Sequence, residues 1–281
     1  MSHGSSVADA LRAAAQALAA SSDTARLDAE WLMAAALGVS RSDMLLRHLR
    51  APAPATFAAL IARRLSHEPL AYILGEQEFF GLALRVTPDV LIPRGDSEVL
   101  VAAALAARPA ARRVLDCGTG SGALLLAVLA HLPHAHGVGI DRSLAALAVA
   151  TDNAARLGLA RRARLVAADW RQPGWARDLG GPFDLILANP PYVEDAAMLA
   201  PDVRDHEPAG ALFAGPEGLD DYHVLIPQLP GLLGAGGAAL VEIGHAQAPA
   251  VSAIAHASGF VVQLHRDLAG LPRVLALCRE G

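Results

Sequence analysis

The chain has 281 residues, 53% of them hydrophobic, which is enough for one large domain and a small one. Its formal net charge is −5, and all 23 basic residues are arginines without a basic run, so electrostatic binding of nucleic acid is not expected. The longest apolar runs, such as residues 99–107, are too short to span a bilayer, and the first residues lack the pattern of a secretory signal.

The first part of the chain, residues 1–70, is predicted to form a small helical bundle. Helical periodicity runs through residues 5–67 and is interrupted at Gly38 and at the proline-bearing stretch 50–55. We expect about four or five helices. The apolar positions expected to face the core in the first two are Val7, Leu11, Ala14, Leu18, Leu27, Trp31, Leu32 and Ala35.

Residues 71–93 have a different pattern. Apolar and polar positions alternate, aromatic residues appear, and turn residues stand at Gly81 and at Pro88-Asp89. This combination predicts a β-hairpin that connects the bundle to the rest of the chain.

From residue 94 to residue 281, strand and helix patterns alternate. The candidate strands are residues 112–117, 136–141, 163–169, 183–188, 238–244, 260–265 and 273–278. Helical segments between most of them predict an α/β fold with a seven-stranded, mostly parallel, doubly wound (Rossmann-like) sheet. Because only a short turn separates the last two strands, we expect them to form an antiparallel hairpin at one edge of the sheet.

A glycine-rich loop follows the first of these strands and leads into a helix. Gly118, Gly120 and Gly122 make a turn free of side chains at the carboxyl end of a strand, where ligands bind in open α/β sheets. Asp141 ends the second strand and suits an acid that binds ribose hydroxyls. These features indicate a cofactor that carries adenosine, and they leave both NAD and S-adenosylmethionine open. A plain tight turn is the weaker alternative.

The third strand ends in Asp169 and Trp170. An acid and an aromatic ring at this position are suited to bracket an adenine, the acid by hydrogen bonding and the ring by contact. Packing of Trp170 in the core or in a lid is an equally good explanation when the residue is considered alone. The adenine role gains support because three successive strand ends would then face one ligand.

The fourth strand is followed by Asn189, Pro190, Pro191 and Tyr192. Two prolines fix the backbone and remove two donors, which leaves a stiff segment that offers carbonyl oxygens. The Asn189 side-chain oxygen and the Pro190 carbonyl are placed to accept the two N–H groups of a planar amide or amine, and Tyr192 to pack on it. Such a segment suits methyl transfer to nitrogen by orientation and electrostatics, without a strong base. A dehydrogenase would have no use for such a segment, so hydride transfer is the weaker reading of the site.

The glycine loop together with Asn-Pro-Pro-Tyr resembles the class I, S-adenosylmethionine-dependent amino-methyltransferases. Further stretches resemble one branch, the release-factor glutamine methyltransferases called HemK or PrmC. These stretches are residues 63–101, 115–123, 189–195, 201–220, 240–247 and 267–274. The segments 92–94 and 204–208 are specific to this protein-modifying group. Gly95 and Ser97 depart from the family pattern, whereas Asp96 and Glu98 keep its acidic character.

The resemblance implies roles for individual residues. The cofactor would be S-adenosylmethionine, bound by Gly118, Thr119, Gly120, Ser121, Gly122, Asp141, Trp170 and Asn189. Asn189, Pro190, Pro191 and Tyr192 would be both the catalytic and the substrate-binding residues. The substrate would be the side-chain amide nitrogen, N(5), of the glutamine in the Gly-Gly-Gln motif of class I peptide-chain release factors. The helical bundle would help to bind the release factor, and the enzyme would act as a monomer.

Several other polar residues have open roles. Arg94 and Glu98 either contact the ligands or merely pair. Asp116 ends the first strand beside the glycine loop, from where it could reach the cofactor's ammonium through water, and Glu242 is an acid within the sheet that could face the same cleft. The histidines at positions 131, 134 and 136 are expected to be solvated rather than to bind a metal. Cys117 and Cys278 form neither a disulfide framework nor a metal motif, which predicts a reducing, cytoplasmic location.

Competing functions remain at this stage. A glutamine methyltransferase acting on a ribosomal protein would share the Asn-Pro-Pro-Tyr segment. A nucleic-acid adenine methyltransferase would need a basic groove or a further domain, and neither is apparent. A protein that binds the cofactor without catalysis would leave the intact Asn-Pro-Pro-Tyr segment unexplained. We expect neither direct nucleic-acid binding nor membrane association.

Overall fold

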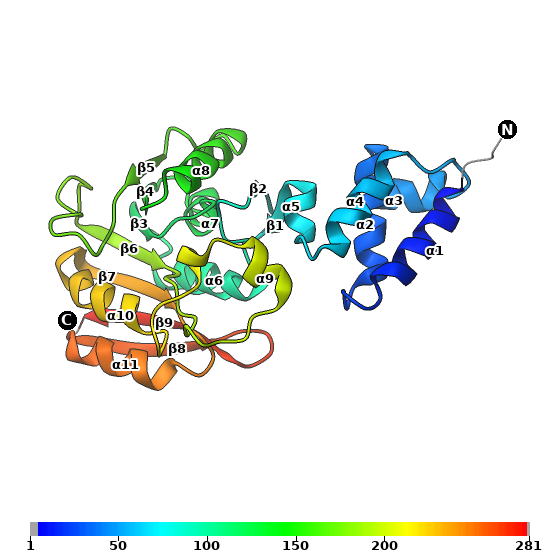
Figure 1. Cartoon of the computed structure of the whole chain (residues 1–281). Coiled ribbons are helices and arrows are strands. Elements are labelled where there is room, and N and C mark those ends of the chain that lie inside the picture. The colour runs from blue at the N-terminus through cyan, green and yellow to red at the C-terminus, as the bar shows by residue number, and fades with distance from the viewer. Residues whose placement is uncertain (1–4, 280–281) are drawn as a thin grey trace. The chain divides into compact units, whose positions relative to one another are not determined.

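The computed structural model describes residues 5–279. The chain divides into two compact units, each described by itself (Figure 1). The first comprises residues up to Glu76 together with Leu199–His206, and the second comprises Gln77–Met198 together with the residues from Glu207 onward. The sequence-based domain boundaries at residues 70 and 93 stay predictions.

The first unit is helical. Its elements are α1 (Val7–Leu18), α2 (Ala25–Leu37), α3 (Arg41–Asp43), a π-helical turn (Met44–His48), α4 (Thr56–Leu65), α5 (Leu70–Leu74) and the short α9 (Pro201–His206). The Ser6 hydroxyl caps α1 by accepting a hydrogen bond from the Asp9 amide, and Gly38 ends α2 in the left-handed conformation with φ of +67°. The predicted buried face of α1 is confirmed, because Val7, Leu11, Ala14 and Leu18 are all buried.

The predicted buried face of α2 is wrong in three of its four positions. Leu32 is buried, but Leu27 and Trp31 are 39% and 42% exposed and Ala35 is exposed too. The helix instead turns Asp28 and Glu30 inward, with Ala29, Met33 and Ala34. The two acids are buried because arginines neutralise them: Arg64 pairs with Asp28 at 2.8 Å, and Arg26 and Arg41 pair with Glu30. A hydrophobicity pattern cannot anticipate charges that find partners on other helices.

The second unit contains the predicted seven-stranded sheet in the order β5-β4-β3-β6-β7-β9-β8. Its strands are β3 (Arg113–Cys117), β4 (His136–Asp141), β5 (Ala163–Ala167), β6 (Phe183–Ala188), β7 (Leu233–Glu242), β8 (Phe260–Arg266) and β9 (Pro272–Arg279). The first five pair in parallel, and β9 is antiparallel to β7 and β8. The expected terminal hairpin at one edge is therefore confirmed. A separate hairpin joins β1 (Glu76–Phe79) to β2 (Leu82–Arg85).

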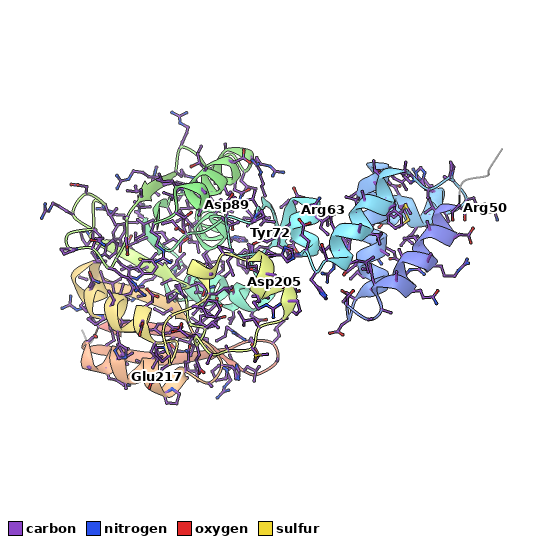
Figure 2. All side chains as sticks on the ribbon, viewed as in Figure 1. Arg50, Arg63, Tyr72, Asp89, Asp205 and Glu217 are labelled. Carbon is purple, nitrogen blue, oxygen red and sulfur yellow. The ribbon has the colours of Figure 1, made fainter. Side chains whose placement is uncertain are left out.

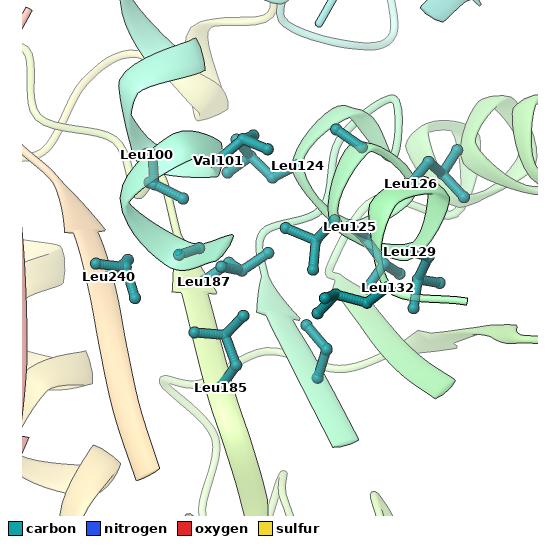
Figure 3. Packing of buried hydrophobic residues seen from close by; sticks show 14 of the residues in the cluster. Leu100, Val101, Leu124, Leu125, Leu126, Leu129, Leu132, Leu185, Leu187 and Leu240 are labelled. Atoms are coloured by element: carbon teal, nitrogen blue, oxygen red, sulfur yellow. The ribbon is translucent and has the colours of Figure 1, made fainter. Parts of the chain in front are cut away.

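Helices cover both faces of the sheet. They are α6 (Glu98–Ala107), α7 (Ala123–His131), α8 (Leu144–Arg156), α10 (Asp220–Leu225) and α11 (Ala248–Ala257). Successive side chains of β6 point to opposite faces of the sheet, and each face has its own hydrophobic core. Leu185 and Leu187 pack with α6 and α7, as Figure 3 shows, whereas Ile186 packs with α10 and α11. Within residues 5–279, we find no helix with the length and apolar character needed to cross a membrane.

Candidate active site

A cavity of about 200 Å³ lies at the carboxyl ends of β3, β4, β5 and β6. The predicted site residues that line it are Gly118, Thr119, Gly120, Ser121, Asp141, Trp170, Asn189 and Pro191. Three predicted residues lie just outside its lining: Gly122, Pro190 and Tyr192. The structure thus brings together residues from four strand ends, of which Gly118 and Pro191 lie 73 positions apart in the sequence.

The glycine loop needs its glycines for backbone geometry. Gly118, Gly120 and Gly122 have φ angles of +77°, +54° and +84°. The loop is fixed by amides of Gly118 and Thr119 that donate to the Ile140 carbonyl at 2.9 and 2.8 Å. At Gly118 a side chain is disfavoured for a second reason, since a Cβ would stand in tight contact with the Trp170 ring, 3.2 Å away. The loop and the indole therefore form a close-fitting cradle at one end of the cavity.

Asp141 is held by two backbone amides. Its Oδ2 accepts a hydrogen bond from the Gly120 amide and its Oδ1 accepts one from the Ser143 amide, both at 2.9 Å. A carboxylate has about four acceptor positions, so each oxygen can accept a further hydrogen bond from a ligand. This donor and acceptor chemistry fits a pair of ribose hydroxyls.

Asp116 lies behind the loop and does not line the cavity. Its Oδ2 accepts a hydrogen bond from the Thr119 hydroxyl at 2.6 Å, and its Oδ1 has no partner among residues 5–279. Burial raises the pKa of this carboxyl to about 7; the Thr119 hydroxyl opposes the rise, and the charge of Asp141 adds to it. Asp116 therefore supports the loop from below, and a direct contact with a ligand is not part of the arrangement.

Trp170 is oriented by a residue that sequence reasoning missed. The indole Nε1 donates to Oδ1 of Asp221 at 2.9 Å, and Arg171 donates to both oxygens of the same carboxylate at 3.1 and 2.8 Å. Asp221 is 3% exposed and lines the cavity. In the sequence it is one of two acids in the first turn of α10, a common position beside a helix N-terminus, so nothing marked it as a site residue.

The segment after β6 places Asn189 and Pro191 on the cavity and Tyr192 beside the core. The Tyr192 carbonyl accepts a hydrogen bond from Nε2 of Gln247 at 3.0 Å, and Gly218 packs so closely that a Cβ there would stand 2.3 Å from this oxygen. Burial raises the pKa of the Tyr192 phenol to about 12, and the charge of Glu242 adds to the effect. The segment is thus held rigidly, and its tyrosine is kept neutral.

The rest of the cavity wall is formed by residues 89–94 and by residues in the segment 208–211. Only the family resemblance had pointed to these two segments. Arg94 forms an ion pair with Glu207, which also accepts a hydrogen bond from the Ile92 amide at 3.2 Å. Pro208, Gly210 and Ala211 also line the cavity, as does Asp89, which is labelled in Figure 2. Arg94 therefore both pairs and lines the cavity. Glu98 instead accepts a hydrogen bond from the Phe80 amide at 2.9 Å and lies outside the lining.

The three histidines at positions 131, 134 and 136 are exposed, as predicted, and His131 also makes contacts within the protein. The His131 ring meets Phe80 edge to face at 5.0 Å, and its Nδ1 lies 2.9 Å from the Ala127 carbonyl. Across residues 5–279, no group of three or more His, Cys, Asp or Glu side chains is arranged to hold a metal ion.

These features define a class of protein. A glycine loop after β3, an acid at the end of β4, Asn-Pro-Pro-Tyr after β6 and an antiparallel terminal hairpin together make a class I methyltransferase. The cradle at Gly118 and Trp170 and the free acceptor positions of Asp141 fit the adenosine of its methyl donor.

Comparison with known proteins identifies the branch. Residues 9–75 match the family model described as PrmC N-terminal domain, and residues 95–204 match the methyltransferase small domain. A release factor glutamine methyltransferase of Geobacter sulfurreducens is 44% identical over 85% of this chain and 84% of its own. One of Cereibacter sphaeroides is 44% identical over 96% and 97%. The chain belongs to the release factor glutamine methyltransferase family.

Among solved structures, the release-factor-specific protein-(glutamine-N5) methyltransferase of Alicyclobacillus acidocaldarius is 28% identical, with a TM-score of 0.43 over 70% of this chain and all of its own.

Proposed function

We propose that this chain transfers a methyl group from S-adenosylmethionine to the side-chain amide nitrogen, N(5), of the Gly-Gly-Gln glutamine in class I peptide-chain release factors. The proposal is carried by one observation: Asn189 and Pro191 line the same cavity as the glycine loop and Asp141. A cofactor held by the loop would therefore meet an amide held at the end of β6. The names of the curated relatives support this choice of substrate.

The residues after β6 would recognise the amide. Asn189 would accept one N–H through its side-chain oxygen, and the Pro190 carbonyl would accept the other. Both acceptors would draw electron density toward the nitrogen and aim its lone pair into the cavity, which is catalysis by orientation. The hydrogen bond from Gln247 to the Tyr192 carbonyl and the close packing at Gly218 support this role, because they hold the segment rigid.

The opposite end of the cavity would hold the methyl donor. When bound, S-adenosylmethionine supplies a methyl group on a positively charged sulfur. Asp141 would accept hydrogen bonds from the ribose hydroxyls, and Gly118 would allow the adenosine to lie close to the backbone. Trp170, fixed through Asp221, would contact the adenine. The amide proton would leave to solvent after transfer, because the methylated nitrogen is strongly acidic.

We further propose that the helical unit helps to bind the release factor. The match of residues 9–75 to the PrmC N-terminal domain supports this division of labour. Leu27 and Trp31 of α2 supply exposed apolar surface, which is common at protein interfaces. The reaction would take place in the cytoplasm, where Cys117 and Cys278 stay reduced.

Intact-mass spectrometry tests the proposal. An unmethylated release factor is incubated with the enzyme and S-adenosylmethionine, and we expect a gain of one methyl group. Asn189→Ala in the enzyme, and replacement of the Gly-Gly-Gln glutamine in the substrate, should each abolish the gain. No transfer by an enzyme that binds the cofactor would overturn the proposal, and ribosomal proteins would then be tested as substrates.

A further inference from the structure

Arg142 is a cavity residue that the proposed chemistry does not yet use. It follows Asp141 directly, and its guanidinium Nη2 donates a hydrogen bond to the main-chain carbonyl of Gly210 at 2.8 Å. All three residues line the cavity, and Arg142 and Gly210 lie 68 positions apart in the chain. The hydrogen bond therefore joins the end of β4 to a part of the cavity wall that comes from a distant segment.

Gly210 is the middle residue of a single turn of 3₁₀ helix, Ala209–Ala211, and the chain is firmly held on both sides of this turn. Before the turn, the side chain of Glu207 is buried and held by its ion pair. After the turn, the carbonyl of Leu212 accepts a hydrogen bond from the amide of Val193 at 2.8 Å. The turn between these two fixed points depends on further contacts for its own position.

The turn has little apolar surface with which to hold itself in place. It consists of two alanines and a glycine, and Ala209 and Gly210 are exposed. Arg142 is exposed as well, and its acceptor is a neutral carbonyl. Because water competes for an exposed hydrogen bond, this contact opens far more readily than the buried ion pair of Glu207.

The glycine at position 210 is explained by the guanidinium beside it. A Cβ at this position would stand 2.6 Å from Nη2 of Arg142, so that the arginine side chain would have to move. The backbone itself does not require glycine here, since the φ of Gly210 lies outside the left-handed region. The absence of a side chain at Gly210 therefore serves the contact with Arg142.

We propose that Arg142 is a positioning residue for cofactor binding: its hydrogen bond to Gly210 holds the turn Ala209–Ala211 closed at the ribose end of the cavity and slows release of the bound cofactor. Asp141 defines this end, because its oxygens have acceptor positions left for ribose hydroxyls. Opening of one exposed hydrogen bond frees the turn, while the buried contacts on both sides of it stay in place. The inference rests on the proposed use of S-adenosylmethionine and not on the choice of release factors as substrates.

A double-mutant cycle of Arg142→Ala and Gly210→Ala tests the inference, because the two substitutions break the same hydrogen bond from opposite sides. Stopped-flow tryptophan fluorescence measures the dissociation rates of S-adenosylmethionine and S-adenosylhomocysteine, with no release factor present. Each single variant should release both compounds about fivefold faster. The double variant should be no faster than either single variant, because all three lack the same contact.

Two matched controls should keep the dissociation rates of the unmodified enzyme. Arg161→Ala removes an exposed arginine that lies outside the cavity lining. Gly231→Ala adds a methyl group at an exposed glycine that has nothing within 4 Å of the added Cβ and whose φ is not left-handed.

The direction of the change separates the hydrogen bond from the charge of Arg142. Loss of a positive charge near the cationic S-adenosylmethionine would by itself slow release of the cofactor, whereas loss of the hydrogen bond speeds it. S-adenosylhomocysteine lacks the sulfonium charge, so its release rate decides between the two effects. Release of this compound that is unchanged or slower in Arg142→Ala would overturn the inference. Increases that multiply in the double variant would overturn it too, because two independent effects would explain them.

A second readout uses the enzyme without cofactor or substrate. The amides of Ala211 and Leu212 donate to the carbonyls of Pro208 and Ala209 at 2.8 and 3.1 Å, so their hydrogen exchange reports opening of the turn. Mass spectrometry should show faster exchange of these amides in Arg142→Ala, and unchanged exchange would contradict the inference. An enzyme that shows both effects but transfers no methyl to release factors would overturn the proposed function and leave the role of Arg142 standing.

Discussion

Arg94 and Glu207 lie 113 positions apart in the chain and form an ion pair at the wall of the cavity. The Glu207 side chain is almost fully buried, whereas Arg94 is partly exposed. The pair joins the segment before α6 to the segment 208–211, and both segments line the cavity. The ion pair therefore links two distant stretches of the chain at the cavity wall.

We predict that Arg94→Ala lowers stability by about 2 kcal/mol, because the buried Glu207 carboxylate loses the positive charge of Arg94. Affinity for S-adenosylmethionine should fall as well, since both wall segments depend on the pair. Glu207→Gln keeps a hydrogen-bond acceptor for the Ile92 amide and should cost less. Urea denaturation and calorimetry measure the two effects. Equal stability of Arg94→Ala and the unmodified enzyme would show that the ion pair has no structural role.

Gly118→Ala should weaken cofactor binding for two reasons. The residue would be held at a φ of +77°, which costs about 1 kcal/mol, and its Cβ would stand 3.2 Å from the Trp170 ring. Gly270→Ala is the matched control: its φ is +80°, but nothing lies within 4 Å of the added Cβ. Both variants should lose similar stability, and only Gly118→Ala should lose affinity in calorimetry. Equal affinities would rule out a role for the cradle.

Asp221→Ala should lower the affinity for S-adenosylmethionine about tenfold, or roughly 1.4 kcal/mol. The substitution removes the acceptor that orients the Trp170 indole and leaves Arg171 without its carboxylate. Asp220→Ala, at the exposed neighbouring acid of α10, is the control and should bind normally. If the two variants bind equally well, the orientation of Trp170 does not matter for the cofactor.

The stability of the enzyme should depend on pH through Glu242. Burial raises the pKa of this carboxyl from 4.5 to about 7, with opposing effects of Ser97 and the charge of Arg273. Because this pKa is higher in the folded than in the unfolded state, the contribution of Glu242 to stability is fully present below about pH 4.5 and is lost as the pH rises through 7. Between pH 5 and pH 8 the loss should be about 2–3 kcal/mol.

Glu242→Gln isolates this contribution, because Asp116 has a similarly raised pKa and remains in both proteins. Urea denaturation at pH 5 and pH 8 should show the variant gaining stability relative to the unmodified enzyme as the pH rises. A difference between the two proteins that does not change with pH would mean that Glu242 titrates at its ordinary pKa in the fold.

Local patterns were enough to predict the sheet and the place of the cavity. The seven strands were visible as apolar runs, and β7 was predicted too short because Gly234, Gly236 and Gly237 interrupt its pattern. The glycine loop and Asn189 were visible because each follows a strand directly. Residues such as Asp221 and Glu207 could not be found in this way, since their roles depend on partners 50 or more positions away.

The inward-facing acids of α2 show the same dependence on distant partners in the helical unit. Asp28 and Glu30 are polar by type and did not belong to the apolar face predicted for this helix, yet arginines from elsewhere in the chain make them core residues. Whether a charged side chain can be buried depends on its partner in the folded structure, and the hydrophobic pattern of a single helix does not reveal that partner.

The most direct test of the account is to locate the transferred methyl group. A release factor is methylated with S-adenosylmethionine that carries a deuterium-labelled methyl, and its peptides are fragmented by tandem mass spectrometry. We predict that the label lies on the side-chain amide of the Gly-Gly-Gln glutamine and is absent with Asn189→Ala. Label on another residue, or undiminished labelling by Asn189→Ala, would contradict the role assigned to the segment after β6.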